Sequence, residues 1–102
     1  MSARKLGLSL TVRAQDDLLQ IWLYTLDRWG VDQAVDYDER LNASLELLRE
    51  NPRLGRARDD LRPGMRGLLV GEHVILYRLM DGEVVVQHII HGKQDIDREL
   101  RD

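Results

Sequence analysis

Residues 66–91 read RGLLVGEHVILYRLMDGEVVVQHIIH, and this stretch decides the fold of the chain. Its apolar runs are rich in Val, Ile, Leu and Tyr, which predicts strands at about residues 66–70, 73–80 and 84–91. Asp81-Gly82 separates the last two strands, and this pair favours a type I′ hairpin turn because both central residues take a positive φ. Gly71-Glu72 can form a second two-residue turn, so we expect the three strands to form an antiparallel meander.

Before this stretch, the spacing of the apolar residues predicts one strand followed by two helices. Leu6 to Val12 alternate between apolar and polar residues, which is typical of a half-buried strand. From Ala14 onward the spacing changes to three and four residues, the period of an amphipathic helix. The expected buried stripes are Leu18, Ile21, Trp22, Thr25, Leu26 and Trp29 on the first helix, and Ala34, Tyr37, Leu41, Leu45 and Leu48 on the second.

The ends of these helices are also marked in the sequence. We expect Thr11 to cap the first helix, Gly30 to end it and Asp32 to cap the second helix. Asn51-Pro52 should end the second helix, because proline cannot continue it. Since only one or two residues separate the helices, they should form an antiparallel hairpin. We therefore expect a single α+β domain over residues 1–102, with an N-terminal strand and an antiparallel helical hairpin packed on an antiparallel β-sheet.

The composition excludes several classes of protein. The chain has 102 residues and no cysteine, so neither a disulfide scaffold nor a thiolate zinc site is possible. No apolar run approaches the ~18 residues of a membrane span, and no apolar signal core follows the N-terminus. We therefore expect a cytoplasmic protein that does not contact a membrane. The net charge of −3 argues against a protein that coats DNA by neutralising phosphates alone.

The charge is spread unevenly along the chain. Residues 14–48 hold two basic and eight acidic residues, a net of −6, whereas residues 49–66 hold six arginines and three acidic residues, a net of +3. Such a run is typical of a solvated surface. The functional alternative is a patch for an acidic partner, either protein or nucleic acid.

The two turns predict which side chains share a face of the sheet. If each turn has two residues, Val70 faces His73 and Met80 faces Glu83, and a slip of one residue would exchange the faces. One face then holds Arg66, Leu68, Val70, His73, Ile75, Tyr77, Val86, His88 and Ile90. The other holds Leu69, Val74, Leu76, Arg78, Val85, Gln87, Ile89 and His91. The helical hairpin covers only one of these apolar faces, so the other should expose an apolar, partly cationic surface that needs a partner.

An arginine on a central strand and two tryptophans have both a structural and a functional interpretation. Arg78 needs a partner, which is either a helix carboxylate such as Asp17 or an acidic residue of a bound protein. Trp22 and Trp29 share the apolar stripe of the first helix, which favours core positions over a platform for stacking bases.

The three histidines do not form an evident metal site. Only His73 and His88 share a face in the predicted register, and no carboxylate is evident beside them, so we expect neither a metal nor a cofactor. His73 and His91 are expected to form structural hydrogen bonds near the strand ends.

Four groups of residues, in this order and at this spacing, form a recognisable set. They are Ala14-x-x-Asp17-Leu18-x-x-Ile21-Trp22-x-Tyr24; Arg28-Trp29-Gly30 followed by Gln33-Ala34; Asn51-Pro52-x-Leu54-Gly55-Arg56 with Leu61-Arg62-Pro63-Gly64-x-Arg66; and Gly71-x-His73-x-Ile75-x-Tyr77-Arg78 with Ile90-His91-Gly92. The set spans about Leu8 to Asp95. It resembles the ParE/RelE family of bacterial toxins, and the ParE branch in particular.

This resemblance implies the toxin of a type II toxin–antitoxin module that inhibits DNA gyrase by binding it. It also implies a ParD-like antitoxin, in which a ribbon-helix-helix domain binds operator DNA and a tail wraps the toxin. The toxin would then reach the operator only through the antitoxin. The residues that we expect at the surface for the antitoxin or the target are Arg66, Leu69, Val74, Leu76, Arg78, Gln87, Ile89, His91 and Lys93.

The sequence departs from the family pattern at three positions. Val12 stands where proline is common, His88 stands where ParE sequences commonly have arginine, and Gln94 stands where a basic residue is usual. Proline suits the first turn of a helix, so its loss softens the helix start. The last strand has less positive charge as a result of the other two changes, which bears on potency more than on fold.

Two alternative functions stay open at this point. The first is a RelE-like, ribosome-dependent mRNA endonuclease, in which histidine acts as the proton-transfer group. Its candidate catalytic residues are His91, Lys93, Arg66 and Arg78, although residues 97–102 contain no tyrosine. The second is a detoxified relative that binds its antitoxin and regulates the operon.

Overall fold

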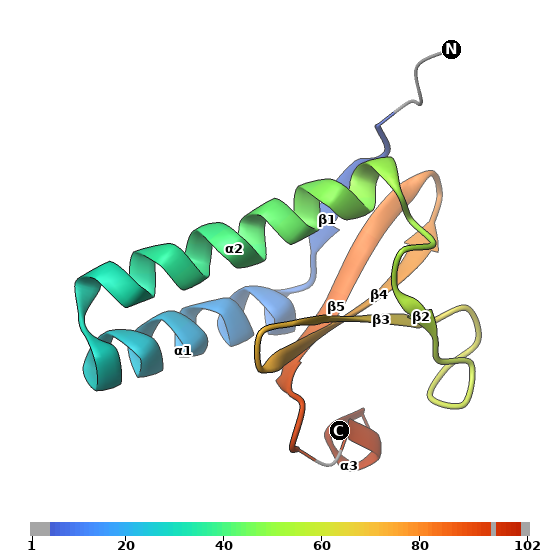
Figure 1. The fold of residues 1–102 in the computed structure, drawn as a ribbon. Coiled ribbons are helices and arrows are strands. Elements are labelled where there is room, and N and C mark those ends of the chain that lie inside the picture. Colours follow the sequence, from blue (N-terminus) through green and yellow to red (C-terminus); the bar gives the residue numbers. More distant parts are fainter. Residues whose placement is uncertain (1–4, 95, 101–102) are drawn as a thin grey trace.

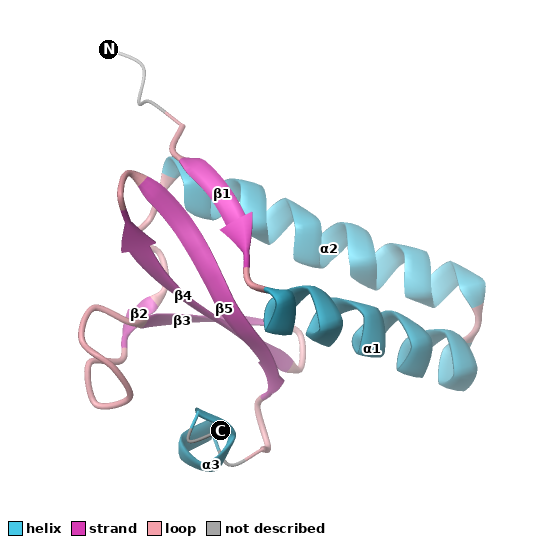
Figure 2. Ribbon diagram, turned by 180° about the vertical axis from the view of Figure 1, so that it is seen from behind, coloured by secondary structure: helices cyan, strands magenta, loops and turns pink. Residues whose placement is uncertain are grey.

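The computed structural model describes residues 5–94 and 96–100, which form one five-stranded sheet with helices on both sides (Figure 1). In chain order the elements are β1 (Gly7–Leu10), α1 (Val12–Trp29), α2 (Val31–Glu50), β2 (Arg56–Ala57), β3 (Arg66–Val70), β4 (His73–Met80), β5 (Glu83–His91) and α3 (Ile96–Leu100). The hairpin of α1 and α2 lies on one side of the sheet and α3 on the other (Figure 2). The predicted α+β class is confirmed, and Asp95, where the family-like stretch ends, lies outside the described residues.

The sheet is mixed, which corrects one part of the prediction. Its strand order is β1-β5-β4-β3-β2. β3, β4 and β5 form the expected antiparallel meander, but β1 pairs with β5 in parallel, with Leu8 beside Val84 and Leu10 beside Val86. Alternating apolar residues predict a strand without predicting its direction. A parallel neighbour requires a crossover connection, and the helical hairpin starts that crossover.

Both turns of the meander have the expected length. Asp81 and Gly82 have φ values of 52° and 76°, so the type I′ prediction is confirmed. In the other turn only Gly71 has a positive φ, of 58°, the pattern of a type II′ turn.

The helical hairpin begins and turns at two specific residues. Thr11 caps α1 as predicted, because its Oγ1 accepts a hydrogen bond from the Ala14 N–H at 3.1 Å and donates one to the Gln87 carbonyl at 2.9 Å. Gly30 is the only residue between the helices, and its φ of 92° makes the sharp reversal possible. The prediction that Asp32 caps α2 is wrong, because α2 already begins at Val31 and Gly30 occupies the cap position.

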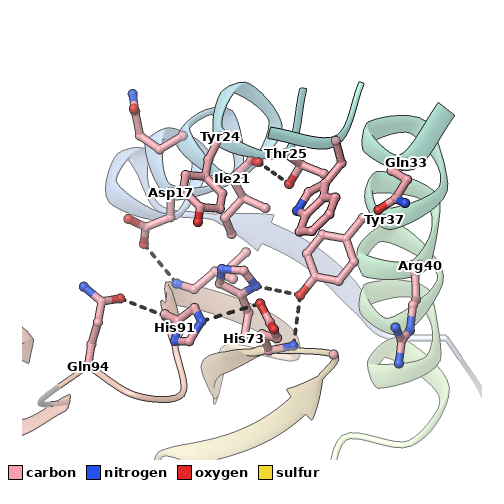
Figure 3. A pocket seen from close by; sticks show the side chains of 15 residues that line it. Asp17, Ile21, Tyr24, Thr25, Gln33, Tyr37, Arg40, His73, His91 and Gln94 are labelled. Carbon is pink, nitrogen blue, oxygen red and sulfur yellow. Dashed lines mark hydrogen bonds and ion pairs between the residues drawn. The ribbon is translucent and has the colours of Figure 1, made fainter. Parts of the chain in front are cut away.

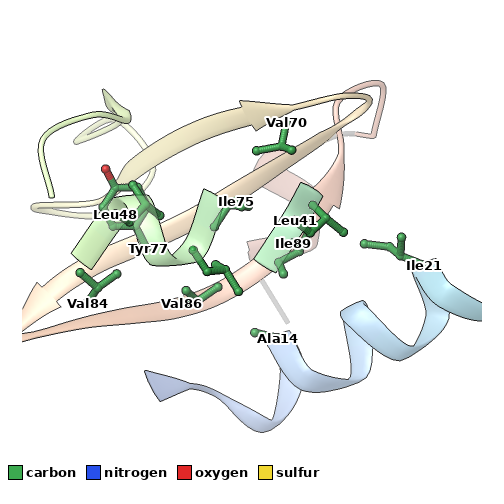
Figure 4. Close-up of a cluster of buried hydrophobic side chains, with 11 residues drawn as sticks. Ala14, Ile21, Leu41, Leu48, Val70, Ile75, Tyr77, Val84, Val86 and Ile89 are labelled. Atoms are coloured by element: carbon green, nitrogen blue, oxygen red, sulfur yellow. The ribbon is translucent and has the colours of Figure 1, made fainter. Parts of the chain in front are cut away.

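The main core lies between the hairpin and one face of the sheet (Figure 4). Ile75, Tyr77, Val84 and Val86 are completely buried there. The helices supply Ala14, Ile21, Leu41, Leu45 and Leu48. The last three confirm the stripe predicted for α2. Of the stripe predicted for α1, Ile21 is in the core and Leu18 packs against it.

Tyr77 fastens the connection after α2 to this core. Its hydroxyl accepts a hydrogen bond from the Gly55 N–H at 2.8 Å and donates one to the Pro52 carbonyl at 2.7 Å. A Cβ atom on Gly55 would lie 2.6 Å from that hydroxyl, so the close approach requires glycine. Burial raises the pKa of the Tyr77 phenol, which keeps its proton available for Pro52.

A β-bulge in β5 changes which side chains share a face. Val70 pairs with His73 and Met80 with Glu83 as predicted, and Tyr77 pairs with Val86, but Leu76 pairs with His88. Gln87 is therefore an extra residue, and every β5 side chain after it exchanges faces relative to the uniform register.

The exchange corrects four predicted positions. Ile89 and His91 lie on the hairpin side with Ile75 and His73, whereas His88 and Ile90 lie on the opposite side with Leu76. The turns define the register only near themselves, and the extra residue lies five positions after Gly82, in a run that is apolar on both faces. Nothing in that run distinguishes the two registers.

The face turned away from the hairpin is covered more fully than predicted. Met65, Leu76, Ile90 and Leu100 form a second buried cluster, packed against Leu61, Val74 and Ile96. Leu61 and Met65 of the loop before β3, together with Ile96 and Leu100 of α3, cover the strand residues of this cluster. Arg62 Nη2 joins the loop to α3 by donating a hydrogen bond to the Leu100 carbonyl at 2.6 Å. The prediction of an open apolar face is therefore wrong for Leu76, but Leu69 on the same face is 67% exposed.

Candidate functional site

A cleft of about 720 Å³ lies between the helical hairpin and one end of the sheet. The end of the hairpin that carries Gly30 projects past the sheet, so the cleft has helices on one side and strand ends on the other (Figures 1 and 3). Its lining comes from α1 (Asp17, Gln20, Ile21, Tyr24, Thr25, Trp29), α2 (Gln33, Tyr37, Arg40), the β3–β4 turn with the first residue of β4 (Gly71, Glu72, His73), the end of β5 (Ile89, His91) and the segment after β5 (Gln94).

Aromatic side chains form the outer part of this cleft. Trp29 is 61% exposed and Tyr24 is 60% exposed, while Tyr37 is half-buried deeper in the cleft. The prediction that Trp29 belongs to the core is wrong, because the last turn of α1 extends beyond the sheet and has no strand beneath it. Large amphipathic rings that stay exposed beside a cleft are typical of binding sites.

Tyr37 links α2 to the β3–β4 turn. Its hydroxyl donates a hydrogen bond to the Val70 carbonyl at 3.0 Å, accepts one from the Glu72 N–H at 3.3 Å, and lies 2.6 Å from Nδ1 of His73 (Figure 3). Because the Tyr37 hydroxyl donates its proton to the Val70 carbonyl, the proton in the hydrogen bond between Tyr37 and His73 must be the one on Nδ1 of the imidazole. Burial raises the pKa of the Tyr37 phenol, so this group stays neutral.

His73 and His91 lie side by side at the base of the cleft. They pair across β4 and β5, and their ring centroids are 5.3 Å apart in an edge-to-face arrangement. Burial, and then the charge of His91, lower the pKa of His73, while Glu72 acts in the opposite direction. His73 is therefore held neutral near pH 7. The predicted pairing of His73 with His88 is wrong, because the bulge moves His88 to the other face.

His91 is oriented by its own chain segment. Its Nδ1 accepts a hydrogen bond from the Lys93 N–H at 3.1 Å, and Oε1 of Gln94 accepts one from the His91 N–H at 2.8 Å. Nε2 of His91 lies 3.6 Å from Oε2 of Glu72, whose side chain is 80% exposed. The expected structural hydrogen bonds of His73 and His91 are thus present.

Asp17 lines the α1 side of the cleft. Its Oδ2 accepts a hydrogen bond from the Ile89 N–H at 2.9 Å, and its Oδ1 pairs with Nε of Arg13 at 3.2 Å. β1 ends at Leu10, opposite Val86, so the Ile89 N–H lies beyond it and the carboxylate takes the place of a strand partner. The predicted pair of Asp17 with Arg78 is wrong, because Arg78 lies on the opposite face and bonds Oε1 of Gln87 at 3.1 Å.

The predicted surface residues do not form one site. Nη1 of Arg66 donates a hydrogen bond to the Gly55 carbonyl at 2.7 Å. Leu76 and Ile89 are buried in different clusters, so the prediction that they lie exposed is wrong. The other predicted positions remain at least partly exposed, namely Leu69, Val74, Arg78, Gln87, His91 and Lys93.

The four candidate nuclease residues are separated in the fold. Arg66 pairs with Tyr77, and His91 pairs with His73, which puts them about 13 Å apart along β4 at ~3.3 Å per residue. Arg78 faces the opposite side of the sheet. Only His91 and Lys93 are neighbours, through the hydrogen bond described above.

Sequence reasoning did not identify Tyr24, Tyr37 and Arg40 as site residues. Tyr37 was expected only in the buried stripe of the second helix, Arg40 outside that stripe, and Tyr24 only as part of the family-like motif. One signal could have found part of the site, because the apolar stripe of α1 continues to the last residue before the Gly30 reversal. If the apolar stripe continues to the tip of a hairpin that projects past the sheet, the last residues of the stripe have no sheet residues to pack against.

Two features are absent from the described residues. Among them, no group of three histidine, cysteine, aspartate or glutamate side chains is arranged to hold a metal ion. Within the same residues, no helix has the length and apolar character required to cross a membrane.

Two solved structures have a similar fold. The chromosomal ParDE toxin–antitoxin system from P. aeruginosa matches with a TM-score of 0.74 and 20% identity, over 85% of this chain and 96% of that one. The RelBE2 toxin–antitoxin complex from Mycobacterium tuberculosis matches with a TM-score of 0.58 and 21% identity, over 86% of this chain and 99% of that one. The chain therefore has a RelE/ParE-type fold.

Sequence comparisons identify the branch. Residues 8–96 match the family model for the ParE toxin of the type II toxin–antitoxin system parDE. Toxin ParE1 of Mycobacterium tuberculosis is 44% identical over 98% of this chain and 100% of its own length. Toxin ParE3 of Caulobacter vibrioides is 34% identical over 82% of this chain and 84% of its own. This chain belongs to the ParE toxin family of type II toxin–antitoxin systems.

Proposed function

We propose that this chain is a toxin that acts by binding DNA gyrase and that a ParD-like antitoxin neutralises it. The observation that carries the proposal is its membership in the ParE family over residues 8–96. The ParDE structure from P. aeruginosa supports an antitoxin partner of the ParD type. In this proposal the toxin acts in the cytoplasm, as one domain over residues 1–102.

The aromatic cleft is the surface that we assign to the antitoxin. Trp29 and Tyr24 present exposed rings, and a wrapping tail would bury them. Exposed residues outside the cleft, such as Leu69 and Lys93, would contact the antitoxin at the rim of the interface or would contact gyrase. Operator DNA is then bound by the antitoxin, since the net charge of the toxin is −3.

The arrangement of the cations supports binding over nuclease chemistry. A general base and the groups that stabilise a phosphoryl transition state must converge on one reacting atom. His91 and Lys93 lie at one end of the sheet, Arg66 bonds Gly55 nearer the other end, and Arg78 occupies the opposite face. The endonuclease alternative therefore lacks an assembled site among the described residues.

The test measures supercoiling by purified gyrase in the presence of the purified chain. We expect supercoiling to be inhibited and to recover when its cognate ParD-like antitoxin is added. Gyrase that is unaffected by a large excess of toxin would contradict the proposed target.

Induction of the chain alone in a bacterium separates the three functions. Filamentation and DNA-damage signalling with continuing protein synthesis are expected for a gyrase poison. Immediate loss of translation, with mRNA cut on the ribosome and the effect removed by His91→Ala, would support the endonuclease. Healthy growth, with a complex that still binds operator DNA, would support the detoxified relative.

A further inference from the structure

We propose that the cleft binds a carboxylate side chain of the antitoxin between His73 and His91, and that this contact takes up a proton. The inference rests on the proposed function, because it names the chemistry by which the cleft recognises that partner. The partner segment would be acidic at the base of the cleft, beside His73 and His91 (Figure 3), and apolar where it meets Trp29 and Tyr24.

The positions of the two imidazole rings carry this inference. Each Nδ1 is engaged within the protein, by the Tyr37 hydroxyl for His73 and by the Lys93 N–H for His91. The rings are thereby fixed on one face of the sheet, 5.3 Å apart, within the lining of the cleft. A carboxylate has two acceptor oxygens, so it can bond two donors that are held side by side in this way.

The structure already contains a carboxylate beside this pair. Oε2 of Glu72 lies 3.6 Å from Nε2 of His91, which is too long for a hydrogen bond, and the Glu72 side chain is 80% exposed. Glu72 therefore interacts only weakly with His91, and displacing its side chain costs little free energy. A carboxylate on a bound partner segment can displace the Glu72 side chain, and it loses contact with water as it enters the cleft.

The remaining charged groups around the histidines favour an acidic occupant. From α1, Asp17 faces the pair, but it is occupied by Arg13 and by the Ile89 N–H. From α2, Arg40 lines the cleft with a positive charge, and Tyr37 is neutral because burial raises its pKa. From the turn there is only Glu72, and from the segment after β5 the neutral amide of Gln94.

Binding of a carboxylate would reverse the protonation state of the cleft. In the free chain, burial and the neighbouring histidine lower the pKa of His73 and keep it neutral. A carboxylate placed within a few ångströms stabilises the imidazolium, which raises that pKa in the complex. The complex then holds more protons than its separate parts, so affinity falls as the pH rises, by up to about tenfold per pH unit for each proton taken up.

The test is calorimetric titration of the chain with its full-length cognate ParD-like antitoxin. Repeating the titration at pH 7.5 in two buffers of different ionisation enthalpy counts the protons exchanged. We expect an uptake approaching one proton and an affinity that falls about three- to tenfold between pH 7 and pH 8. Carbon-13 spectra of the histidine rings should show His73 protonated at pH 7 in the complex and neutral in the free chain.

Asparagine variants identify the group that receives the proton. His73→Asn with His91→Asn keeps a polar atom near the position of each Nδ1 but cannot be protonated, so the uptake and the pH dependence should disappear. His88→Asn is the matched control, because His88 is the third histidine and lies on the opposite face of the sheet. Circular dichroism shows whether each variant is folded, and single variants replace the double variant if it is not.

The outcomes distinguish the inference from the proposed function. Tight binding by the wild-type chain without proton uptake overturns the inference and leaves the proposed function standing. Uptake that persists in the double asparagine variant also overturns it, because the proton then resides elsewhere. Failure of the wild-type chain to bind the antitoxin at any pH overturns both.

Discussion

The helical hairpin carries one continuous apolar stripe, but its two halves end in different surroundings. In the half over the sheet, Ala14, Leu41 and Leu48 are no more than 1% exposed. In the half that projects past the sheet (Figure 1), Trp29 and Val31 are each 61% exposed. Apolar periodicity therefore shows which way a helix faces. It does not show whether anything in the same chain covers that face.

The largest effect is expected in the covered half, from Leu48→Ala. Leu48 is completely buried, so its truncation should lower the free energy of unfolding by ~2–5 kcal/mol through lost burial and a residual cavity. Leu47→Ala is the matched control one residue earlier, where the side chain is 46% exposed, and it should cost less than ~1 kcal/mol. Urea denaturation measures both variants. Equal losses of unfolding free energy would contradict the conclusion that Leu48 is buried and Leu47 is exposed.

In the projecting half, Trp29→Ala should separate binding from stability. The free energy of unfolding should change by less than ~1 kcal/mol, because most of the ring is exposed. Affinity for the antitoxin should fall by about 2 kcal/mol or more, roughly 30-fold, as for other aromatic anchors. Val12→Ala, at the far end of α1 with the side chain 83% exposed, is the control. Calorimetry would contradict the assignment of the cleft if both variants bound equally well.

A smaller effect on the covered side is expected from Tyr77→Phe. The change leaves the ring in place but removes the acceptor of the Gly55 N–H and the donor to Pro52, and Gly55 is buried. An unsatisfied buried N–H costs ~1–3 kcal/mol. Tyr24→Phe in the projecting half should be nearly neutral in the same urea measurement. A neutral Tyr77→Phe would mean that the connection after α2 is held by other contacts.

The smallest effect concerns the pH dependence of stability in the free chain. The pKa of His73 is lowered from 6.5 in the folded state, so the folded chain binds fewer protons there than the unfolded chain. Its contribution to stability is present above pH 6.5 and is lost as the pH falls through 6.5 toward the lowered value. Denaturation at pH 5 and pH 7.5 should therefore show a smaller acid loss in His73→Asn than in the wild type. An identical loss in both chains would show that burial does not act on this histidine.

Sequence reasoning predicted the elements well because each has a local cause. Asp81-Gly82 defines a hairpin, Thr11 caps a helix and Gly30 reverses the chain, and all three take effect within a few residues. It failed at Gln87, because a bulge in a strand that is apolar on both faces leaves no mark in the pattern. It failed at Trp29 because exposure there depends on how far the sheet extends beneath the hairpin.

The site was predicted only in part for the same reason. His73 and His91 were singled out, but they were assigned to opposite faces, and the bulge is what brings them together. Tyr37 was taken only as a stripe residue, although its hydroxyl joins three backbone and side-chain groups of the β3–β4 region. Leu76 and Ile89 were expected at the surface, yet α3 and the hairpin each cover one of them.

The sequence by itself determined the order of the elements, the two hairpin turns, the apolar face of each helix and the resemblance to the ParE family, because these depend on local backbone preferences and on motif spacing. Only the tertiary structure decided the direction of β1, the faces of residues 88–91 and the cleft beneath the projecting hairpin. Those features depend on which segments meet across long separations. A local pattern states that an apolar side chain needs cover, and only the assembled chain decides what provides it.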